Sequence, residues 1–244
     1  MLGSAAVLAT IRAVEAVGYT FLMSEQALVG AARDPSGAAV RQTARVWSET
    51  LCRRAGVVVE VQGGEQVDWS RPMLVMANHQ SLLDIPVIFR ALPVPFGVLA
   101  KKELFALPAF GKAIRALGCV PIDRSDRSAG QESIAHAAER VHAGASLLVF
   151  PEGTRSERSG VRELKKGPFY LAEAADVPIV PVGVRGTRAI CPKDVFAIRP
   201  GRAEVRVGEP IAPLGKGSDA RDELRARVRA ALVELSGEAA RGGR

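Results

Sequence analysis

Two short segments contain the residues whose types and spacing are best suited to chemistry. Residues 78–84 read Asn-His-Gln-Ser-Leu-Leu-Asp, so that His79 stands five positions before Asp84. An imidazole oriented by a carboxylate can act as a general base and take a proton from a hydroxyl group. Residues 150–156 read Phe-Pro-Glu-Gly-Thr-Arg-Ser, and the guanidinium of Arg155 is suited to binding a phosphate monoester. A base together with an anion-binding group predicts transfer chemistry on a phosphorylated alcohol.

Each segment also has a plainer interpretation. His79 could cap a helix while Asp84 favours the dipole of its first turn, and Glu152 and Arg155 could form a salt bridge in a surface loop. A serine hydrolase is not predicted, because the sequence has no Gly-x-Ser-x-Gly elbow. A metal site is not predicted either, because one histidine and scattered carboxylates do not make a recognisable ligand set.

The composition is that of a globular protein with a basic surface. The 244 residues are 48% hydrophobic and 24% charged, which suits one large α/β domain with a sizeable core. The net charge of +7 favours an anionic partner, either a phosphorylated substrate or a membrane surface, although excess arginine could serve solubility alone. Aromatic residues make up only 5%, too few to favour a protein that stacks nucleic-acid bases.

The cysteines and the hydropathy pattern predict where the protein works. Cys52, Cys119 and Cys191 are odd in number and widely spaced, which argues against disulfides and for a reducing compartment. No signal-peptide pattern is present. The longest stretch without Asp, Glu, Lys or Arg, residues 72–83, is shorter than the roughly 18 residues of a transmembrane helix. We therefore expect no membrane span.

The first 55 residues predict two apolar-faced helices. Residues 4–32 form a helical pattern with an unusually wide apolar surface, which Asp-Pro-Ser-Gly at 34–37 interrupts. A second helix is expected over 38–55, with Trp47 on its apolar face and several arginines alongside. Such a pair could lie in a membrane interface. The alternative is that the two helices pack on the main domain or on each other.

From residue 56 to 236, strand patterns alternate with helix patterns. This alternation predicts an α/β fold with a largely parallel mixed sheet of about seven strands covered by helices. Strands are expected at residues 57–61, 73–77, 97–100, 119–122, 147–150, 179–184 and 204–207. Helices are expected near residues 81–91, 103–116, 130–143, 168–176 and 218–235, followed by a flexible tail over 237–244. Because ligands in such sheets bind beyond the carboxyl ends of strands, His79 and Arg155 are predicted to face one crevice.

In these segments the chain resembles the 1-acyl-sn-glycerol-3-phosphate acyltransferases of the glycerolipid acyltransferase superfamily. The resemblance covers roughly residues 73–184, under half of the chain. Residues 118–124 also match, except that Pro121 stands where the family has a bulky apolar residue. The most specific blocks, found in the family's order, are Asn-His-x4-Asp at 78–84, Phe-Pro-Glu-Gly-Thr-Arg-Ser at 150–156 and Val-Pro-Ile-Val-Pro-Val at 177–182.

The resemblance implies roles for individual residues. His79 would be the catalytic base and Asp84 its partner. The implied acceptor site comprises Arg155, Lys101 and Arg124 on the phosphate, with Glu152, Gly153 and Thr154 shaping the site.

The resemblance also implies an activity and partners. The reaction would move an acyl group from acyl-CoA or acyl-carrier protein to the 2-hydroxyl of lysophosphatidic acid, giving phosphatidic acid without a further cofactor. The enzyme would act at the cytoplasmic face of a membrane phospholipid surface, docked by its N-terminal helix pair. Within the same chemistry, glycerol-3-phosphate or another lysophospholipid could be the acceptor. From a different class, the chain could be a non-catalytic module that binds anionic lipid.

Overall fold

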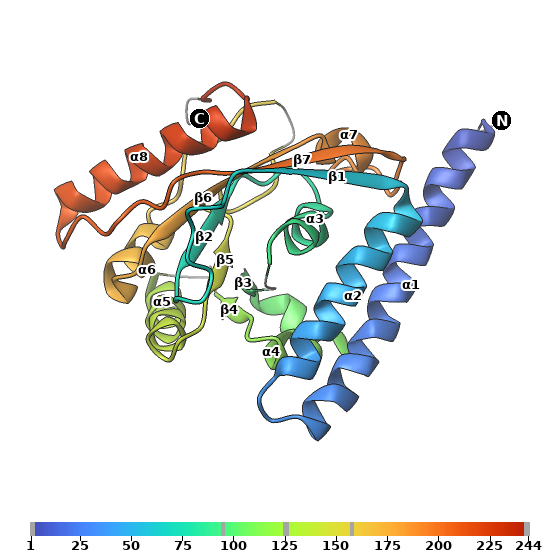
Figure 1. Cartoon of the computed structure of the whole chain (residues 1–244), viewed down its shortest axis with the longest axis horizontal. Helices are drawn as coiled ribbons and strands as arrows, with labels where there is room; N and C mark the ends of the chain where they lie inside the picture. Colours follow the sequence, from blue (N-terminus) through green and yellow to red (C-terminus); the bar gives the residue numbers. More distant parts are fainter. Residues whose placement is uncertain (1–2, 94–95, 124–126, 157–158, 242–244) are drawn as a thin grey trace.

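The computed structural model shows a helix-covered sheet flanked on one side by an antiparallel helix pair (Figure 1). It describes residues 3–93, 96–123, 127–156 and 159–241. In chain order the elements are α1 (Ser4–Arg33), α2 (Ala38–Ala55), β1 (Val57–Gln62), β2 (Leu74–Ala77), α3 (Asp84–Ala91), β3 (Gly97–Lys101), the 3₁₀ helix η1 (Lys102–Ala106), α4 (Phe110–Ala116), β4 (Val120–Ile122), α5 (Arg127–His142), β5 (Leu147–Val149), α6 (Gly167–Ala175), β6 (Ile179–Arg185), α7 (Thr187–Ile190), β7 (Gly201–Val207) and α8 (Ser218–Ser236).

The strands form one mixed sheet in the order β1-β7-β6-β2-β5-β3-β4. The strands from β6 to β4 in that order run parallel, whereas β7 is antiparallel to β6 and β1 is parallel to β7. The predicted seven-stranded, largely parallel sheet is confirmed. In its centre, Met76 of β2 pairs with Pro181 of β6 on one side and with Val149 of β5 on the other. The carboxyl ends of β2, β5 and β6 therefore meet at one edge.

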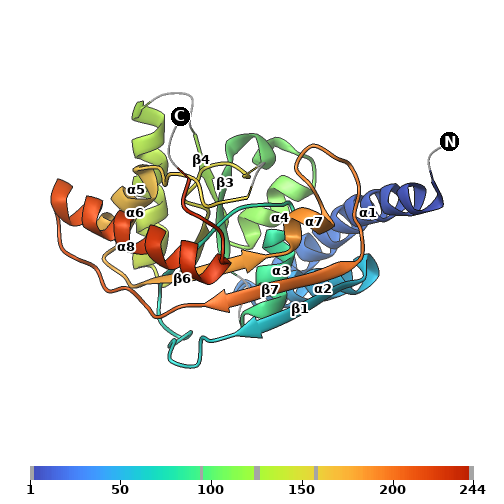
Figure 2. The same cartoon turned by 90° about the horizontal axis from the view of Figure 1, so that it is seen from above.

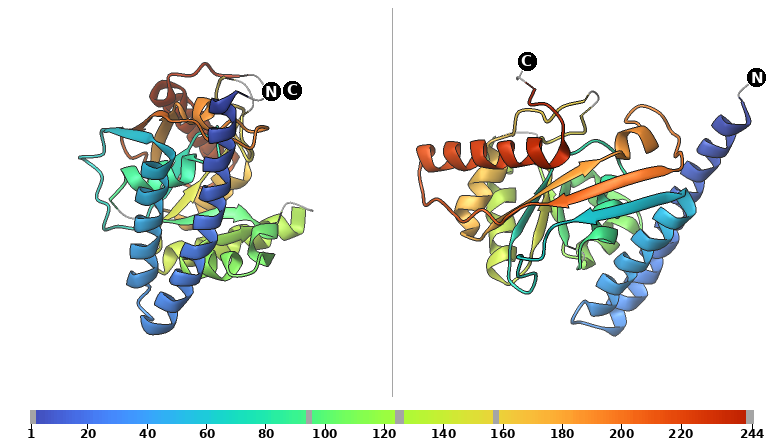
Figure 3. Two further views of the ribbon diagram at one scale, coloured as in Figure 1. Left: turned by 90° about the vertical axis from the view of Figure 1, so that its right-hand side faces the viewer. Right: turned by 45° about the horizontal axis from the view of Figure 1, so that its top comes forward.

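Each face of the sheet carries its own apolar core, because side chains alternate along a strand. On β2, Leu74 and Met76 belong to the cluster shared with α5, α6 and α8. Val75 and Ala77 belong to the cluster shared with α2 and α3. All four side chains are fully buried, which explains why the parallel strands are apolar on both faces. Figure 3 shows α8 across the sheet from the helix pair α1 and α2.

One expected helix is divided in two. The sequence predicts a single helix near 103–116, but η1 ends at Ala106 and α4 begins only at Phe110. Pro108 has no backbone N–H to donate, and Ala109 has a positive φ of 55° that an α-helix excludes. These two residues turn the chain between the helices. The short helix α7 was not expected at all.

The inner side of the helix pair packs on the main domain. Leu51 and Cys52 of α2 belong to the same buried cluster as α3. Trp47 meets Phe89 of α3 edge to face, with ring centroids 6.4 Å apart, and its Nε1 donates a hydrogen bond to Thr20 of α1 at 3.0 Å. Near the amino end of α1, the Ile198 N–H donates to a carbonyl of that helix, so the loop after α7 lies beside α1 (Figure 2). The alternative interpretation, in which the helices pack on the domain and on each other, thus holds for this side.

The outer side of α1 is apolar and exposed. Only five of its thirty residues are buried, and most of these are small. By length and composition α1 is also long and apolar enough to cross a membrane, although its longest charge-free stretch is short. The exposed apolar residues of α1 are Val7, Leu8, Ile11, Val14, Val17, Phe21, Leu22 and Val29.

The residues expected to form a flexible tail make specific contacts as far as the structure describes them. After Gly237, whose left-handed conformation ends α8, the chain turns back towards the sheet edge. Ala240 forms a parallel bridge with Val161, with hydrogen bonds of 3.0 and 2.9 Å to either side. Residues 237–241 are therefore part of the fold.

Candidate active site

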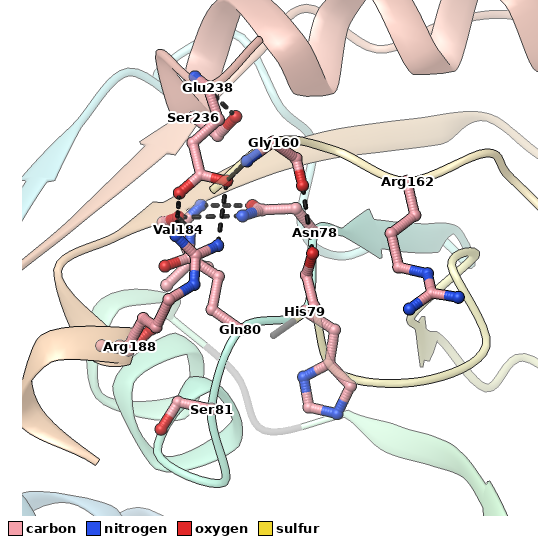
Figure 4. Close-up of polar contacts among 12 residues, drawn as sticks. Asn78, His79, Gln80, Ser81, Gly160, Arg162, Val184, Arg188, Ser236 and Glu238 are labelled. Atoms are coloured by element: carbon pink, nitrogen blue, oxygen red, sulfur yellow. Dashed lines mark hydrogen bonds and ion pairs between the residues drawn. The ribbon is translucent and has the colours of Figure 1, made fainter. Parts of the chain in front are cut away.

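Asn78 fixes the first segment to the sheet. Its Oδ1 accepts a hydrogen bond from the Val184 N–H at 2.7 Å, and its Nδ2 donates to the Val184 carbonyl at 3.0 Å. Gln80 Nε2 donates to the same carbonyl at 2.6 Å (Figure 4). These bonds continue the contact with β6 beyond Ala77, the last residue of β2. They give the backbone of His79 a fixed position where it leaves the sheet.

His79 and Asp84 form the expected pair. His79 Nδ1 lies 2.7 Å from Asp84 Oδ2, and the imidazole stacks on the Phe150 ring with centroids 4.0 Å apart. The His79 side chain keeps 17% of its surface exposed, whereas Asp84 has none exposed. When Nδ1–H donates its hydrogen bond to Asp84 Oδ2, Nε2 is the nitrogen free to accept a proton. The geometry suits a general base.

Every contact of the Asp84 carboxylate orients it towards His79. Oδ2 also accepts hydrogen bonds from the backbone N–H groups of Gln80 at 2.7 Å and Ser81 at 2.9 Å, and Oδ1 accepts one from Thr187 Oγ1 at 2.5 Å. A buried charge requires such partners. Because Asp84 is the first residue of α3, it also favours the helix dipole, as in the plainer interpretation. The two roles coexist.

Glu152 joins the two segments. Its side chain is buried, with Oε1 accepting the His79 N–H at 2.8 Å and Oε2 accepting the Arg162 N–H at 3.0 Å. Burial raises the pKa of this carboxyl group, and the two N–H donors oppose that rise. The structure places the carboxylate against the backbone of two loops, where the sequence predicted a contact with the acceptor or with Arg155.

The turn after β5 depends on Gly153. Its φ of 76° is left-handed and its N–H donates to the Phe150 carbonyl at 3.0 Å, a conformation that favours glycine. Thr154 is exposed at the turn. Two residues later the Ser156 N–H donates to the His79 carbonyl at 2.7 Å. The turn thus brings the second segment back against the first.

Arg155 lies at the same edge of the sheet as the His79–Asp84 pair. Its half-buried side chain donates from Nη1 to the Lys193 carbonyl at 3.4 Å. Burial raises the pKa of the nearby Cys191 thiol; the Ser81 hydroxyl and the charge of Arg155 oppose that rise, and the charge of Asp84 adds to it. The charges of Arg155 and Asp84 therefore both act on the Cys191 thiol. The segments 78–84 and 150–156 thus lie around the loop that begins at Cys191.

Lys101, another of the predicted cations, lies farther along the edge. Lys101 ends β3, the second strand from β2, and its side chain is exposed. Its neighbour Lys102 pairs with Asp123 at 2.6 Å, which joins the ends of β3 and β4. Arg124 lies outside the described residues. The structure therefore brings Arg155, but not Lys101, to the segment that carries His79.

The thiols are buried and weakly acidic. Burial raises the pKa of Cys52 and of Cys119 to about 11, and Cys191 shifts in the same direction. A thiol in this state is a poor nucleophile near neutral pH, because the thiolate is the reactive form. Among the residues that the structure describes, no group of three or more His, Cys, Asp or Glu side chains could hold a metal ion.

Sequence reasoning missed three contributors to this site. Thr187 follows β6 as His79 follows β2, so the rule that singled out His79 could have found it. The contact between Asn78 and Val184 had no such signal, because it depends on which strand lies beside β2. The stacking of Phe150 on the imidazole likewise requires knowing that β5 is the neighbour of β2.

The chain is similar to known acyltransferases over most of its length. A family model described as Acyltransferase matches residues 58–185. The chain is 34% identical over 195 residues to the 1-acyl-sn-glycerol-3-phosphate acyltransferase of Saccharomyces cerevisiae, covering 79% of this chain and 64% of that protein. It is 32% identical over 190 residues to the human 1-acyl-sn-glycerol-3-phosphate acyltransferase alpha, covering 78% and 67%.

The fold also matches a solved structure over almost its whole length. The crystal structure of the 1-acyl-sn-glycerophosphate (LPA) acyltransferase PlsC from Thermotoga maritima gives a TM-score of 0.80 at 28% identity, covering 95% of this chain and 94% of that one. The curated relatives are longer. The chain covers 64% of the yeast protein and 51% of one from Chlamydomonas reinhardtii, so it spans about half to two thirds of such relatives.

Proposed function

Since the chain belongs to the acyltransferase family, we propose that it transfers a fatty acyl group from a thioester to the 2-hydroxyl of lysophosphatidic acid, forming phosphatidic acid. The observation that carries this proposal is the 2.7 Å contact between His79 Nδ1 and Asp84 Oδ2, with the imidazole partly exposed. Arg155, at the same edge, supports a phosphorylated acceptor. The names of the relatives, acyltransferases of 1-acyl-sn-glycerol-3-phosphate, support this particular acceptor.

The proposed reaction is a direct transfer. His79 Nε2 takes the proton of the acceptor hydroxyl while the oxygen attacks the thioester carbonyl carbon. The tetrahedral intermediate expels the donor thiolate, which receives that proton, so that a C–O bond replaces the C–S bond. Asp84 keeps Nε2 unprotonated beforehand and stabilises the imidazolium afterwards. The buried, weakly acidic cysteines support direct attack over an acyl-enzyme intermediate.

The acceptor phosphate is assigned to Arg155. A guanidinium offers parallel N–H donors to a phosphate, and the Lys193 carbonyl accepts a hydrogen bond from Nη1 of this one. Lys101, at the end of β3, is proposed to add positive charge farther along the edge. Arg124 is proposed as a further phosphate contact from the resemblance alone. Gly153 and Thr154 form the turn that presents Arg155, and the Glu152 carboxylate joins this segment to the backbone of His79 and Arg162.

The membrane is the proposed working surface. Residues 1–55 are assigned as the docking unit and 56–236 as the acyltransferase domain, because the outer side of α1 is apolar and exposed while its inner side packs on the domain. A lysolipid and an acyl chain would reach the enzyme from that surface. The cytoplasmic face is proposed from the resemblance and from the unpaired cysteines. Either acyl-CoA or acyl-carrier protein could be the donor.

Product analysis tests the function. Radiolabelled acyl-CoA and acyl-carrier protein are offered separately with lysophosphatidic acid, glycerol-3-phosphate and other lysophospholipids, and the lipids are resolved by thin-layer chromatography. We expect label in phosphatidic acid, reduced about 10²–10⁴-fold in His79→Ala. Near-normal transfer by that variant would remove the proposed base. Binding to anionic vesicles with no transfer from any donor would favour the lipid-binding module instead.

Acceptor kinetics test the role of Arg155. Arg155→Ala should raise the KM for lysophosphatidic acid at least tenfold, because a charge-assisted bond to phosphate is worth about 1.5–3 kcal/mol. Arg71→Ala is the matched control, since Arg71 is exposed near the opposite, amino end of β2. Equal KM values in the two variants would assign the phosphate to another cation.

A further inference from the structure

The ion pair between Glu238 and Arg188 does not contact the imidazole of His79. It joins two chain segments that each contact the proposed catalytic pair. Glu238, just after α8, receives the Arg188 guanidinium in a two-pronged contact with N–O distances of 2.8 and 3.0 Å. The same carboxylate accepts the Gly160 N–H at 2.6 Å. Figure 4 shows Glu238 between Arg188 and Gly160, with the segment that carries His79 beside them. One side chain thus links three parts of the molecule: residues 237–241, here called the C-terminal strap, the helix α7 and the loop after Arg155.

The first segment leads to Asp84. Arg188 is adjacent in the chain to Thr187, whose hydroxyl donates to Asp84 Oδ1 at 2.5 Å. Both residues belong to α7, a helix of only four residues. So short a helix has little stability of its own, because its backbone bonds alone do not repay the ordering of its residues. The contact with Glu238 therefore fixes the position from which Thr187 reaches the carboxylate.

The second segment leads to the His79 backbone. Ser156 donates its N–H to the His79 carbonyl at 2.7 Å and its hydroxyl to the Gly160 carbonyl at 3.2 Å. Farther along, the Arg162 N–H binds Glu152, whose other oxygen binds the His79 N–H. Both backbone groups of His79 are therefore held by the loop or its partner, and Glu238 holds the middle of that loop at Gly160.

Gly160 is the residue that allows the strap to come so close. Its φ is 111°, and a Cβ built there would lie 2.4 Å from Arg241 Cγ and 2.9 Å from the Ala239 carbonyl oxygen. Beyond it, the Val161 N–H donates to Ala239 and the Arg241 N–H returns a bond to Val161. The strap and the loop are therefore also in backbone contact, at the residues that directly follow Glu238 and Gly160.

We propose that Glu238, through its joint contact with Arg188 and Gly160, is a positioning residue for the His79–Asp84 pair. This inference rests on the proposed function for its kinetic consequence. Misplacement of a catalytic group by about 1 Å can cost about 10²-fold in rate. A residue that contacts the pair only through its neighbours can therefore still change the rate measurably. Glu238 and Arg188 touch neither the imidazole nor the Asp84 carboxylate themselves. Their effect passes through Thr187 on one side and Ser156 on the other.

The chain contains a closely matched control. Glu173 of α6 pairs with Arg221 of α8 and also accepts a glycine N–H, that of Gly217, at 2.7 Å. Its side chain is 16% exposed and that of Arg221 is 22% exposed, against 15% and 22% for Glu238 and Arg188. This second pair stabilises α6 against α8. Glu173→Gln therefore reproduces the chemical change and its burial without touching either segment.

The test compares Glu238→Gln with Glu173→Gln in the full chain. For Glu238→Gln we expect kcat for acyl transfer to fall about tenfold or more, with a shifted acid limb of the pH–rate profile. We also expect the low-field proton resonance of the Nδ1–H bonded to Asp84 to move or broaden. The protein has three histidines, so this signal is assigned by its loss in His79→Gln. Glu173→Gln should leave all three readouts as in the parent chain.

Equal behaviour of the two glutamine variants in kcat, pH profile and resonance would overturn the positioning role. If Glu238→Gln does not fold, Arg188→Lys replaces it, with a smaller loss in the same direction because lysine keeps the charge but not the fork. The resonance needs no substrate. A parent chain without transferase activity would therefore refute the proposed function while the resonance still decided the role of Glu238.

Discussion

The His79–Asp84 site and the outer side of α1 both reverse the usual distribution of side chains, in opposite senses. At the site, polar side chains are buried: Asn78, Asp84 and Glu152 have at most 1% of their surface exposed. On α1, large apolar side chains such as Ile11 and Val14 are about half exposed. Buried polar groups and exposed apolar surfaces are the informative exceptions in a soluble protein.

The two exceptions differ in where their partners lie. The buried carboxylates of Asp84 and Glu152 have their hydrogen-bond partners inside the fold. The inner side of α1 packs on the domain, whereas its outer side is apolar and exposed in the structure. The free energy of that outer surface therefore depends on whether water or lipid covers it. Changes at the site should therefore alter activity and unfolding together. Changes on α1 should alter association with a membrane and leave unfolding nearly unchanged.

Asp84→Asn should give the largest effect. The amide keeps the shape but loses the charge, and its NH₂ group cannot accept the bonds that the carboxylate accepts. We expect kcat to fall about 10²–10⁴-fold and the free energy of unfolding to fall by about 1–3 kcal/mol. Acyl-transfer kinetics and urea unfolding measure the two quantities. A fall in only one of them would separate the catalytic role of the buried network from its structural role.

Substitutions on α1 test the opposite pattern. The double change Ile11→Asp and Val14→Asp should weaken binding to anionic phospholipid vesicles at least tenfold, since each buried aliphatic side chain contributes about 1.5–3 kcal/mol. The free energy of unfolding should stay within about 0.5 kcal/mol. Vesicle sedimentation measures the binding.

The control for α1 is Val61→Asp on β1. Val61 is 46% exposed, against 47% for Ile11, but it lies on the sheet and not on the helix pair. Comparable vesicle binding by the control and the double variant would mean that α1 is not the docking surface.

Thr187→Val tests whether the network acts as a unit. Valine has nearly the shape of threonine but cannot donate the 2.5 Å bond to Asp84 Oδ1. Leaving one carboxylate oxygen without that donor should cost about 1–3 kcal/mol of unfolding free energy and lower kcat several-fold. Thr43→Val, on α2, is the control, because its hydroxyl bonds only a carbonyl of its own helix. Similar losses of unfolding free energy and kcat in both variants would show that the bond to Asp84 contributes no more than an ordinary hydroxyl bond within a helix.

Thiol reagents should have the smallest effect. Cys52 and Cys119 have pKa values of about 11, raised by burial, so the neutral thiol persists well above neutral pH and the thiolate appears only as the pH rises towards that value. At pH 8 about one thiol in a thousand is ionised. Activity should survive iodoacetamide at that pH, with labelling followed by mass spectrometry. Rapid inactivation with label on Cys191 would revive an acyl-enzyme mechanism.

Local patterns in the sequence predicted most of the elements. Alternation and helical spacing located the strands of the sheet and the long helices, because those periods are fixed by backbone geometry. The exceptions were short or interrupted elements. Ala109, a non-glycine residue with positive φ, gave no warning that the helix near 103–116 would divide, and α7 is too short to show a period.

For the candidate site, the sequence singled out the proposed base and its partner more readily than the residues that hold them. His79, Asp84 and Arg155 were singled out by type and spacing. The role of Glu152 was predicted towards a ligand, whereas its carboxylate binds backbone N–H groups of two loops. The resemblance grouped Lys101 with Arg155 on the acceptor phosphate, but strand order puts Lys101 two strands away from β2.

The sequence by itself determined which side chains can exchange a proton or bind a phosphate, and which strand ends carry them. It could do so because chemical type and local period are properties of neighbouring residues. Only the tertiary structure decided that β5 and β6 flank β2, which brings Glu152, Thr187 and the strap at Glu238 to the same pair. Strand order and loop closure depend on packing between residues far apart in the chain, and no local pattern encodes them.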